Sequence, residues 1–163
     1  MTRATIATEL GDIEVELYDE SAPKATANFI KLAGQGYYDD VIFHRVIPGF
    51  VIQAGDGEHG KKASLNASRV GTGGPGYTFA DEPVTTEYAR GTVAMARTSQ
   101  PDSVGSQFFI VLDDAAQASL AAANTYQIIG TVTSGMEVAD AIADAADREI
   151  PSDPVVMTDV SID

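Results

Sequence analysis

Three polar side chains, those of His44, Arg45 and Gln53, interrupt an otherwise apolar stretch of the chain between Phe43 and Asp56. Their neighbours are mostly phenylalanine, valine and isoleucine. A charged side chain is rarely fully buried unless it is paired. Arg45 is therefore either a structural cation with a buried partner or a functional group directed into an apolar groove, and the pattern leaves both interpretations open.

The available residue types exclude several kinds of chemistry. The chain has no cysteine, which excludes disulfides, thiolate metal sites and cysteine nucleophiles. His44 and His59 do not form a histidine-based zinc motif, and we expect no metal and no cofactor. A triad of Ser106, His44 and Asp56 can be drawn, but the G-x-S-x-G motif is absent and we do not favour it. The G-x-G-x-x-G pattern at 71–76 follows a polar loop and opens no helix, so we reject a dinucleotide site.

The groups that remain are a guanidinium and side-chain amides beside aromatic rings. This set suits a reaction that needs neither a nucleophile nor proton transfer, such as rotation about an amide bond. The twisted state loses amide resonance, which makes the barrier about 20 kcal/mol. A hydrogen-bond donor that meets the amide nitrogen only in the twisted state would raise the rate.

Several short strands and two helices must position these groups. Alternating apolar residues predict a hairpin over 3–18, and Pro48-Gly49 predicts a turn between two strands of segment 43–56. Further strands are expected at 77–79, 91–96, 107–112, 126–132 and 156–162, about eight in all. In the strand 107–112, Gln107 and Phe109 should share one face and Phe108 and Ile110 the other. Helices are expected from Ser21–Pro23 to Gly34, with Ser21 as a candidate N-cap, and from a capping box at 134–137. The strands should pair antiparallel, in a sandwich or a closed barrel.

The segment 57–76 is a long, polar, glycine-rich loop. It contains Lys61, Lys62 and Arg69 against one acidic residue, Glu58. Loops longer than about 12–15 residues without structure of their own are usually functional or mobile. The loop is either a solvated insertion or a border of the binding groove that attracts acidic segments. The stretch 113–124 is rich in alanine, and we assign no helix or strand to it.

Length and charge set broader limits. The 163 residues are expected to form one domain, 1–163, and the net charge of −14 argues against binding to nucleic acid. Aspartate outnumbers glutamate 15 to 9 and there are four lysines, a composition typical of proteins that work in concentrated salt. A merely acidic cytosolic protein is the alternative. Without an apolar spanning segment or a signal-peptide pattern, we expect a cytoplasmic protein that does not enter the membrane.

Two motifs resemble a known family. The segment Phe43–Asp56 and the block Gly105–Ile110 look like the hallmark motifs of the cyclophilin-type peptidyl-prolyl cis-trans isomerases, in the right order and spacing. The resemblance implies a mainly β fold, a closed eight-stranded antiparallel β-barrel with two capping helices. It also implies rotation of X-Pro bonds in proline-containing peptides and unfolded proteins, in support of protein folding. We expect a monomer.

The resemblance also implies residue roles. Arg45 matches the family's catalytic arginine, and Gln53 matches a glutamine that orients it. The positions that bind substrate would be His44, Phe50, Val51, Gly71, Ala96, Arg97, Gln107, Phe109, Leu120 and Tyr126. Of these, Phe50, Val51, Phe109 and Leu120 would wall a proline pocket, whereas Ala96, Arg97 and Gln107 would contact the peptide backbone. Without the resemblance, Phe50 and Phe109 would be interpreted as ordinary core residues. His44 is interpreted as structural or groove-lining rather than as an acid or base.

Some positions depart from the family pattern. Arg97 replaces the usual asparagine, which is tolerable if only its backbone contacts the peptide, and Val51 replaces a longer methionine. Ser119 stands where many relatives have an aromatic residue, so we expect cyclosporin to bind weakly. Two other functions remain as alternatives, a non-catalytic module that binds proline-containing peptides and a barrel that carries small apolar ligands. The guanidinium argues against the carrier.

Overall fold

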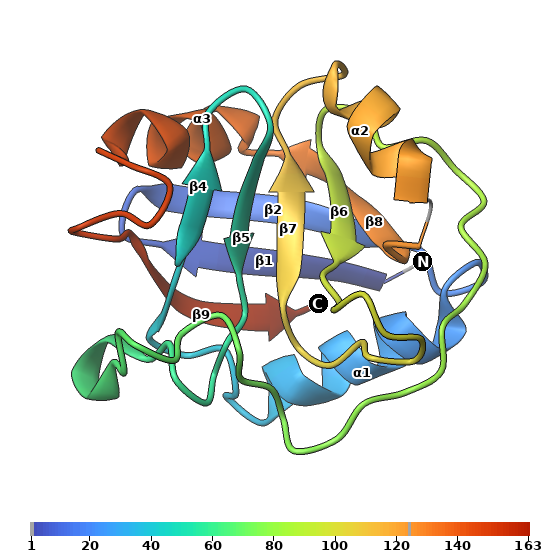
Figure 1. Ribbon diagram of the computed structural model, residues 1–163, viewed down its shortest axis with the longest axis horizontal. Helices are drawn as coiled ribbons and strands as arrows, with labels where there is room; N and C mark the ends of the chain where they lie inside the picture. Colours follow the sequence, from blue (N-terminus) through green and yellow to red (C-terminus); the bar gives the residue numbers. More distant parts are fainter. Residues whose placement is uncertain (1, 124) are drawn as a thin grey trace.

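A single curled sheet with three helices around it forms the framework of the chain (Figure 1). The computed structural model describes residues 2–123 and 125–163. Within those residues the strands are β1 (Thr2–Thr8), β2 (Gly11–Leu17), β3 (Val41–Ile42), β4 (Arg45–Ile47), β5 (Val51–Ala54), β6 (Thr92–Met95), β7 (Phe108–Val111), β8 (Ile128–Ser134) and β9 (Val156–Ile162). The helices are α1 (Pro23–Gly34), α2 (Ala116–Ala123) and α3 (Met136–Ala145), with a 3₁₀ turn at Lys62–Ser64.

The strands are hydrogen-bonded in the order β3-β9-β1-β2-β8-β6-β7-β5-β4, and each adjacent pair is antiparallel. The two edge strands, β3 and β4, are consecutive in the chain, so the sheet curls round to bring its ends together. Figure 1 shows β4, β5, β7 and β6 crossing in front of β2, β1 and β9. The mainly β, antiparallel architecture that was predicted is therefore confirmed.

Details of the prediction differ from the structure. The described residues form nine strands rather than about eight, and no ladder joins β3 to β4, so the curled sheet is not a fully closed barrel. The short β3 has two residues, too few for an alternating pattern. The strand expected at 77–79 is reduced to one isolated bridge between Phe79 and Val104.

Strand β7 separates the core from the candidate site. Phe108 and Ile110 are buried in the main core, where the Phe108 ring meets Phe29 edge-on at 5.5 Å. Phe109 points to the opposite face and belongs to a second apolar cluster with Val51. This alternation follows from the two-residue period of a strand and was predicted from the sequence.

The caps of two helices were predicted wrongly, although α1 begins at Pro23 as expected. No side chain from the residues at the start of α1 caps this helix. Instead the carboxylate of Glu82 accepts hydrogen bonds from the backbone N–H groups of Lys24 (3.1 Å) and Ala25 (2.9 Å). The capping box at 134–137 is also absent, because Ser134 ends β8 and Gly135 occupies the N-cap with φ of +95°.

The alanine-rich stretch contains a helix that the sequence analysis missed. Residues 116–123 form α2, and Asn124 lies outside the described residues. Alanine is the best helix former, but alanine on all sides produces no apolar stripe for a periodicity argument. The helix buries Leu120 in the second apolar cluster and so supplies one wall of the candidate site.

Candidate active site

The hairpin of β4 and β5 places two of the predicted residues opposite each other. Arg45 pairs with Gln53, and Gly49 turns the chain with φ of +75°. The Arg45 side chain is 45% exposed, whereas Val46 beside it is buried in the core. Arg45 is therefore not a fully buried cation, and its exposure is compatible with a functional group at the surface of a groove.

An apolar pocket of about 240 Å³ opens beside Arg45. The ring of Phe109 forms one wall and meets Tyr126 edge-on, with ring centroids 5.5 Å apart. The pocket is lined by nine of the predicted residues, which are Arg45, Phe50, Val51, Gln53, Ala96, Arg97, Phe109, Leu120 and Tyr126. Strands β4 to β7, helix α2 and the segment before β8 bring these residues together.

A second pocket of about 420 Å³, lined mainly by glycine and by residues with polar side chains, adjoins the first and shares Gln53, Ala96 and Arg97 with it. Of the predicted residues, Gly71 and Gln107 lie here. The segment 71–74 lines this pocket, and sequence reasoning missed the rest of its wall, which includes Tyr77, Thr78, Thr98, Ser103, Gly105 and Ser106. Small polar loop residues have no periodicity, so no signal in the pattern marked them. Together the two pockets form one groove with an apolar and a polar part.

Side-chain contacts at Arg45 and Gln53 differ from those implied by the resemblance. The Nε of Arg45 lies 3.3 Å from Oε1 of Glu149, and the N–H of Val46 donates to the Glu149 carbonyl at 2.7 Å. The Nε2 of Gln53 donates to Oε1 of Gln107 at 3.1 Å. No side-chain hydrogen bond joins Gln53 to Arg45 in the part of the chain that the structure describes. The carboxylate of Glu149, which sequence reasoning missed, contacts the guanidinium instead.

Arg97 has a buried and fully engaged side chain. Its guanidinium is 7% exposed, donates to Oδ2 of Asp81 at 2.7 Å and donates to the carbonyl of Gln100 at 2.7 Å. The same Asp81 oxygen accepts the N–H of Asp102 at 3.1 Å. The ion pair thus joins the segment around Asp81 to the turn after β6, and both border the groove.

His44 lies outside both pockets, under the loop. It is buried, its ring edge would be about 3.4 Å from a Cβ built on Gly71, and its Nδ1 has no hydrogen-bond partner among the described residues. Burial lowers the pKa of His44 from 6.5 to about 4, with Asp56 opposing that shift and Arg45 adding to it. The imidazole is therefore neutral at pH 7.

The lowered pKa predicts a loss of stability in acid. Between pH 6.5 and about 4 the unfolded chain binds a proton at His44 that the folded chain does not. The free energy of unfolding should therefore fall as the pH decreases through this window, by about 3 kcal/mol from this residue. Urea unfolding at pH 7 and at pH 4.5 measures the loss. His44→Gln should lose less than the wild type. Equal losses in the two proteins would contradict the prediction.

The triad considered above is not supported by the contacts. Ser106 donates to the carbonyl of Gly55 at 2.7 Å, and the carboxylate of Asp56 accepts only backbone N–H groups. The described residues contain no group of three or more His, Asp or Glu side chains that could hold a metal ion. None of their helices has the length and apolar character needed to cross a membrane.

A curled antiparallel sheet thus carries a half-exposed arginine beside two adjoining pockets, one of them walled by aromatic and aliphatic side chains. The model of the family "Cyclophilin type peptidyl-prolyl cis-trans isomerase/CLD" matches residues 3–162. The chain belongs to this family, and it is a peptidyl-prolyl cis-trans isomerase.

Individual relatives agree with this assignment. The chain is 42% identical over 145 residues to a probable peptidyl-prolyl cis-trans isomerase of Brucella suis, covering 85% of this chain and 70% of that one. It is 46% identical over 129 residues to peptidyl-prolyl cis-trans isomerase B of Bacillus subtilis, covering 78% and 80%. A Cryptosporidium parvum cyclophilin-type isomerase, crystallised in the presence of the dipeptide Ala-Pro, superposes with a TM-score of 0.83 at 33% identity, covering 99% and 98%.

Proposed function

We propose that the 240 Å³ pocket holds the ring of a substrate proline while Arg45 donates a hydrogen bond to the prolyl nitrogen. The observation that carries this proposal is the placement of Arg45 on the same pocket as Phe109 and Phe50. Among the described residues the hydrogen bonds of Arg45 engage only its Nε. Its two Nη groups are therefore available to a bound peptide.

The proposed reaction follows from the chemistry of the twisted imide. As the X-Pro bond rotates, conjugation is lost and the nitrogen regains a lone pair, which accepts the Arg45 hydrogen bond more strongly than the planar ground state does. One charge-assisted hydrogen bond contributes about 1.5–3 kcal/mol. A ~10⁴-fold acceleration needs about 5.5 kcal/mol, so selective binding of the twisted conformer and preorganised electrostatics must supply the rest.

The polar pocket is proposed to bind the peptide on one side of the proline. We propose that the substrates are proline-containing segments of unfolded proteins and that the enzyme assists protein folding. Gln107 is already engaged there, because its Nε2 donates to the carbonyls of Gly71 and Gly73 and its Oε1 accepts from Gln53. We propose that Gln107 shapes the groove and contacts the peptide with its remaining acceptor capacity.

The test separates an enzyme from a binding module. Isomerisation of a proline peptide and the dissociation constant of that peptide are measured for the wild type and for Arg45→Ala, at matched high salt. Loss of rate with retained binding supports catalysis by Arg45. Binding without acceleration in either protein would favour the module.

We further propose that the protein is a cytoplasmic monomer adapted to concentrated salt and that cyclosporin binds it weakly. Support for weak cyclosporin binding comes from Ser119, which is exposed on α2 where many relatives have an aromatic residue. Support for the adaptation comes from the net charge of −14 with only four lysines.

The acidic composition predicts a salt-dependent stability. In dilute buffer the negative charges repel one another, whereas at about 1 M salt the Debye length falls to about 3 Å and the repulsion is screened. The melting temperature should rise by about 5 °C or more between 0.1 M and 2 M KCl, roughly 1–2 kcal/mol for a chain of this length. Thermal unfolding followed by circular dichroism measures it. A flat profile would contradict the adaptation.

A further inference from the structure

Asp56 is a fully buried carboxylate that follows directly after β5 and Gly55. Its Oδ1 accepts hydrogen bonds from the backbone N–H groups of Glu58 (3.0 Å) and His59 (2.8 Å). Its Oδ2 accepts from the N–H groups of Gly71 (2.8 Å) and Gly73 (3.0 Å). Through these hydrogen bonds the Asp56 carboxylate therefore holds the beginning and the end of the loop 57–76 close together.

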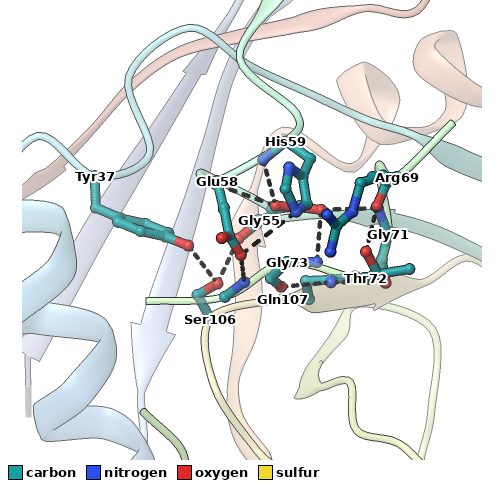
Figure 2. Close-up of polar contacts among 12 residues, drawn as sticks. Tyr37, Gly55, Glu58, His59, Arg69, Gly71, Thr72, Gly73, Ser106 and Gln107 are labelled. Carbon is teal, nitrogen blue, oxygen red and sulfur yellow. Dashed lines mark hydrogen bonds and ion pairs between the residues drawn. The ribbon is translucent and has the colours of Figure 1, made fainter. Parts of the chain in front are cut away.

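The far end of the loop comes unusually close to this carboxylate. A Cβ built on Gly73 would lie 2.2 Å from Oδ1 of Asp56 and 2.8 Å from Cβ of Glu58, so a side chain at this position does not fit. Figure 2 shows Glu58 and His59 gathered next to Gly71 and Gly73, with Gln107 beside the glycines. The close approach explains why glycine stands at position 73.

The same two glycines whose N–H groups donate to Asp56 accept hydrogen bonds at their carbonyls. The carbonyls of Gly71 and Gly73 each accept from Nε2 of Gln107 at 2.9 Å. Oε1 of Gln107 accepts from Gln53 at 3.1 Å, and Gln53 lines both pockets opposite Arg45 in the hairpin. A continuous series of hydrogen bonds thus leads from a buried carboxylate to the surface on which the peptide would lie.

We propose that Asp56 is a positioning residue for the isomerase reaction, although it lines neither pocket. It holds the segment 71–73 in place, and the carbonyls of that segment hold Gln107 and Gln53 in the orientation that binds the peptide. The inference rests on the proposed function of the groove. Because these amides contact the peptide in the planar and twisted states alike, Asp56 acts on peptide affinity and KM rather than on kcat.

Asp56→Asn tests the proposal with little change in shape. The amide keeps one acceptor oxygen, but its –NH₂ then faces two backbone N–H groups as a donor against donors. We expect KM and the dissociation constant of a proline peptide to rise by about 10-fold, in line with the loss of one charge-assisted contact, while kcat changes less than about 3-fold. The dissociation constant, measured by NMR titration, reports on Asp56 even if isomerisation by the wild type fails.

Asp40→Asn is the matched control. The Oδ2 of Asp40 accepts the N–H of Ala63 at 3.1 Å, so this carboxylate also anchors the loop, but it is not linked to Gln107. We expect KM to be unchanged in Asp40→Asn. An equal rise in KM in both variants would mean that general loosening of the loop is responsible, and this would overturn the specific role of Asp56.

A double-mutant cycle with Gln107→Ala distinguishes positioning from a purely structural role. If Asp56 acts through Gln107, the double variant should bind peptide about as weakly as the weaker single variant. If the two substitutions instead weaken peptide binding independently, so that their effects on the dissociation constant multiply, the proposal is overturned. Should Asp56→Asn fail to fold, Gly73→Ala keeps the carboxylate but blocks the close approach. It must then reproduce the rise in KM, and an unchanged KM in that variant would equally overturn the proposal.

Discussion

Arg45→Ala is expected to lower kcat/KM for isomerisation of a proline peptide by about 100-fold, equivalent to about 2.7 kcal/mol of transition-state stabilisation. This is the upper part of the range for one charge-assisted hydrogen bond. Peptide affinity should change much less, because the proline ring is held by the apolar walls that include Phe109 and Leu120. A spectroscopic isomerisation assay measures the rate, and the dissociation constant is measured on the same samples.

Two further variants control this experiment. Arg3→Ala removes an exposed arginine from β1, a strand that contributes no residue to either pocket, and should leave kcat/KM unchanged. Arg45→Lys keeps the charge but lacks the planar fork of donors, so it should restore only part of the rate. Folding should be intact in Arg45→Ala, since its side chain is 45% exposed and its ion pair with Glu149 is open to solvent. A loss of activity below about 3-fold would contradict the assigned role.

Asp81→Ala is expected to lower the free energy of unfolding by about 3 kcal/mol. The guanidinium of Arg97 is 7% exposed, and removal of Asp81 leaves this buried charge without its carboxylate partner. For a chain of this length the melting temperature should fall by about 6–12 °C. Because Arg97 lines both pockets, peptide binding should weaken as well. Chemical denaturation gives the free energy, and thermal unfolding gives the shift in midpoint.

The chain contains its own matched control for this prediction. Arg90 and Asp140 form another ion pair at the same distance of 2.7 Å, but their side chains are 42% and 45% exposed. Exposed pairs contribute about 0–1 kcal/mol, so Asp140→Ala should cost less than about 1 kcal/mol. If the two variants lose equal stability, burial does not decide the strength of these pairs and the account of Arg97 is wrong.

Features that depend on nearby residues could be predicted from the sequence. The hairpin around Pro48-Gly49, the opposite faces of Phe108 and Phe109, and the mainly β antiparallel fold all follow from turn chemistry and a period of two. The resemblance to cyclophilins then predicted which residues line the pocket. Nine of its predicted residues line one cavity, although the individual roles of Arg45 and Gln53 stay predictions.

Features that depend on distant residues could not be predicted in this way. Glu82 caps a helix that lies 57 residues earlier in the chain, and Glu149 reaches Arg45 across 104 positions. Asp56 likewise joins parts of a loop that carries no periodic signal. Each of these contacts is made by an acidic side chain, and in so acidic a sequence nothing local distinguishes a structural carboxylate from a solvated one.

The rate of cis–trans interconversion of a peptide that is bound to the protein tests the central claim most directly. With protein in excess, nearly all of a proline peptide is bound, and NMR exchange spectroscopy then measures cis–trans interconversion on the protein without a contribution from affinity. The account predicts fast interconversion on the wild type and interconversion about 100-fold slower on Arg45→Ala at equal saturation. Equal rates on the two proteins would show that the Arg45 guanidinium does not stabilise the twisted bond.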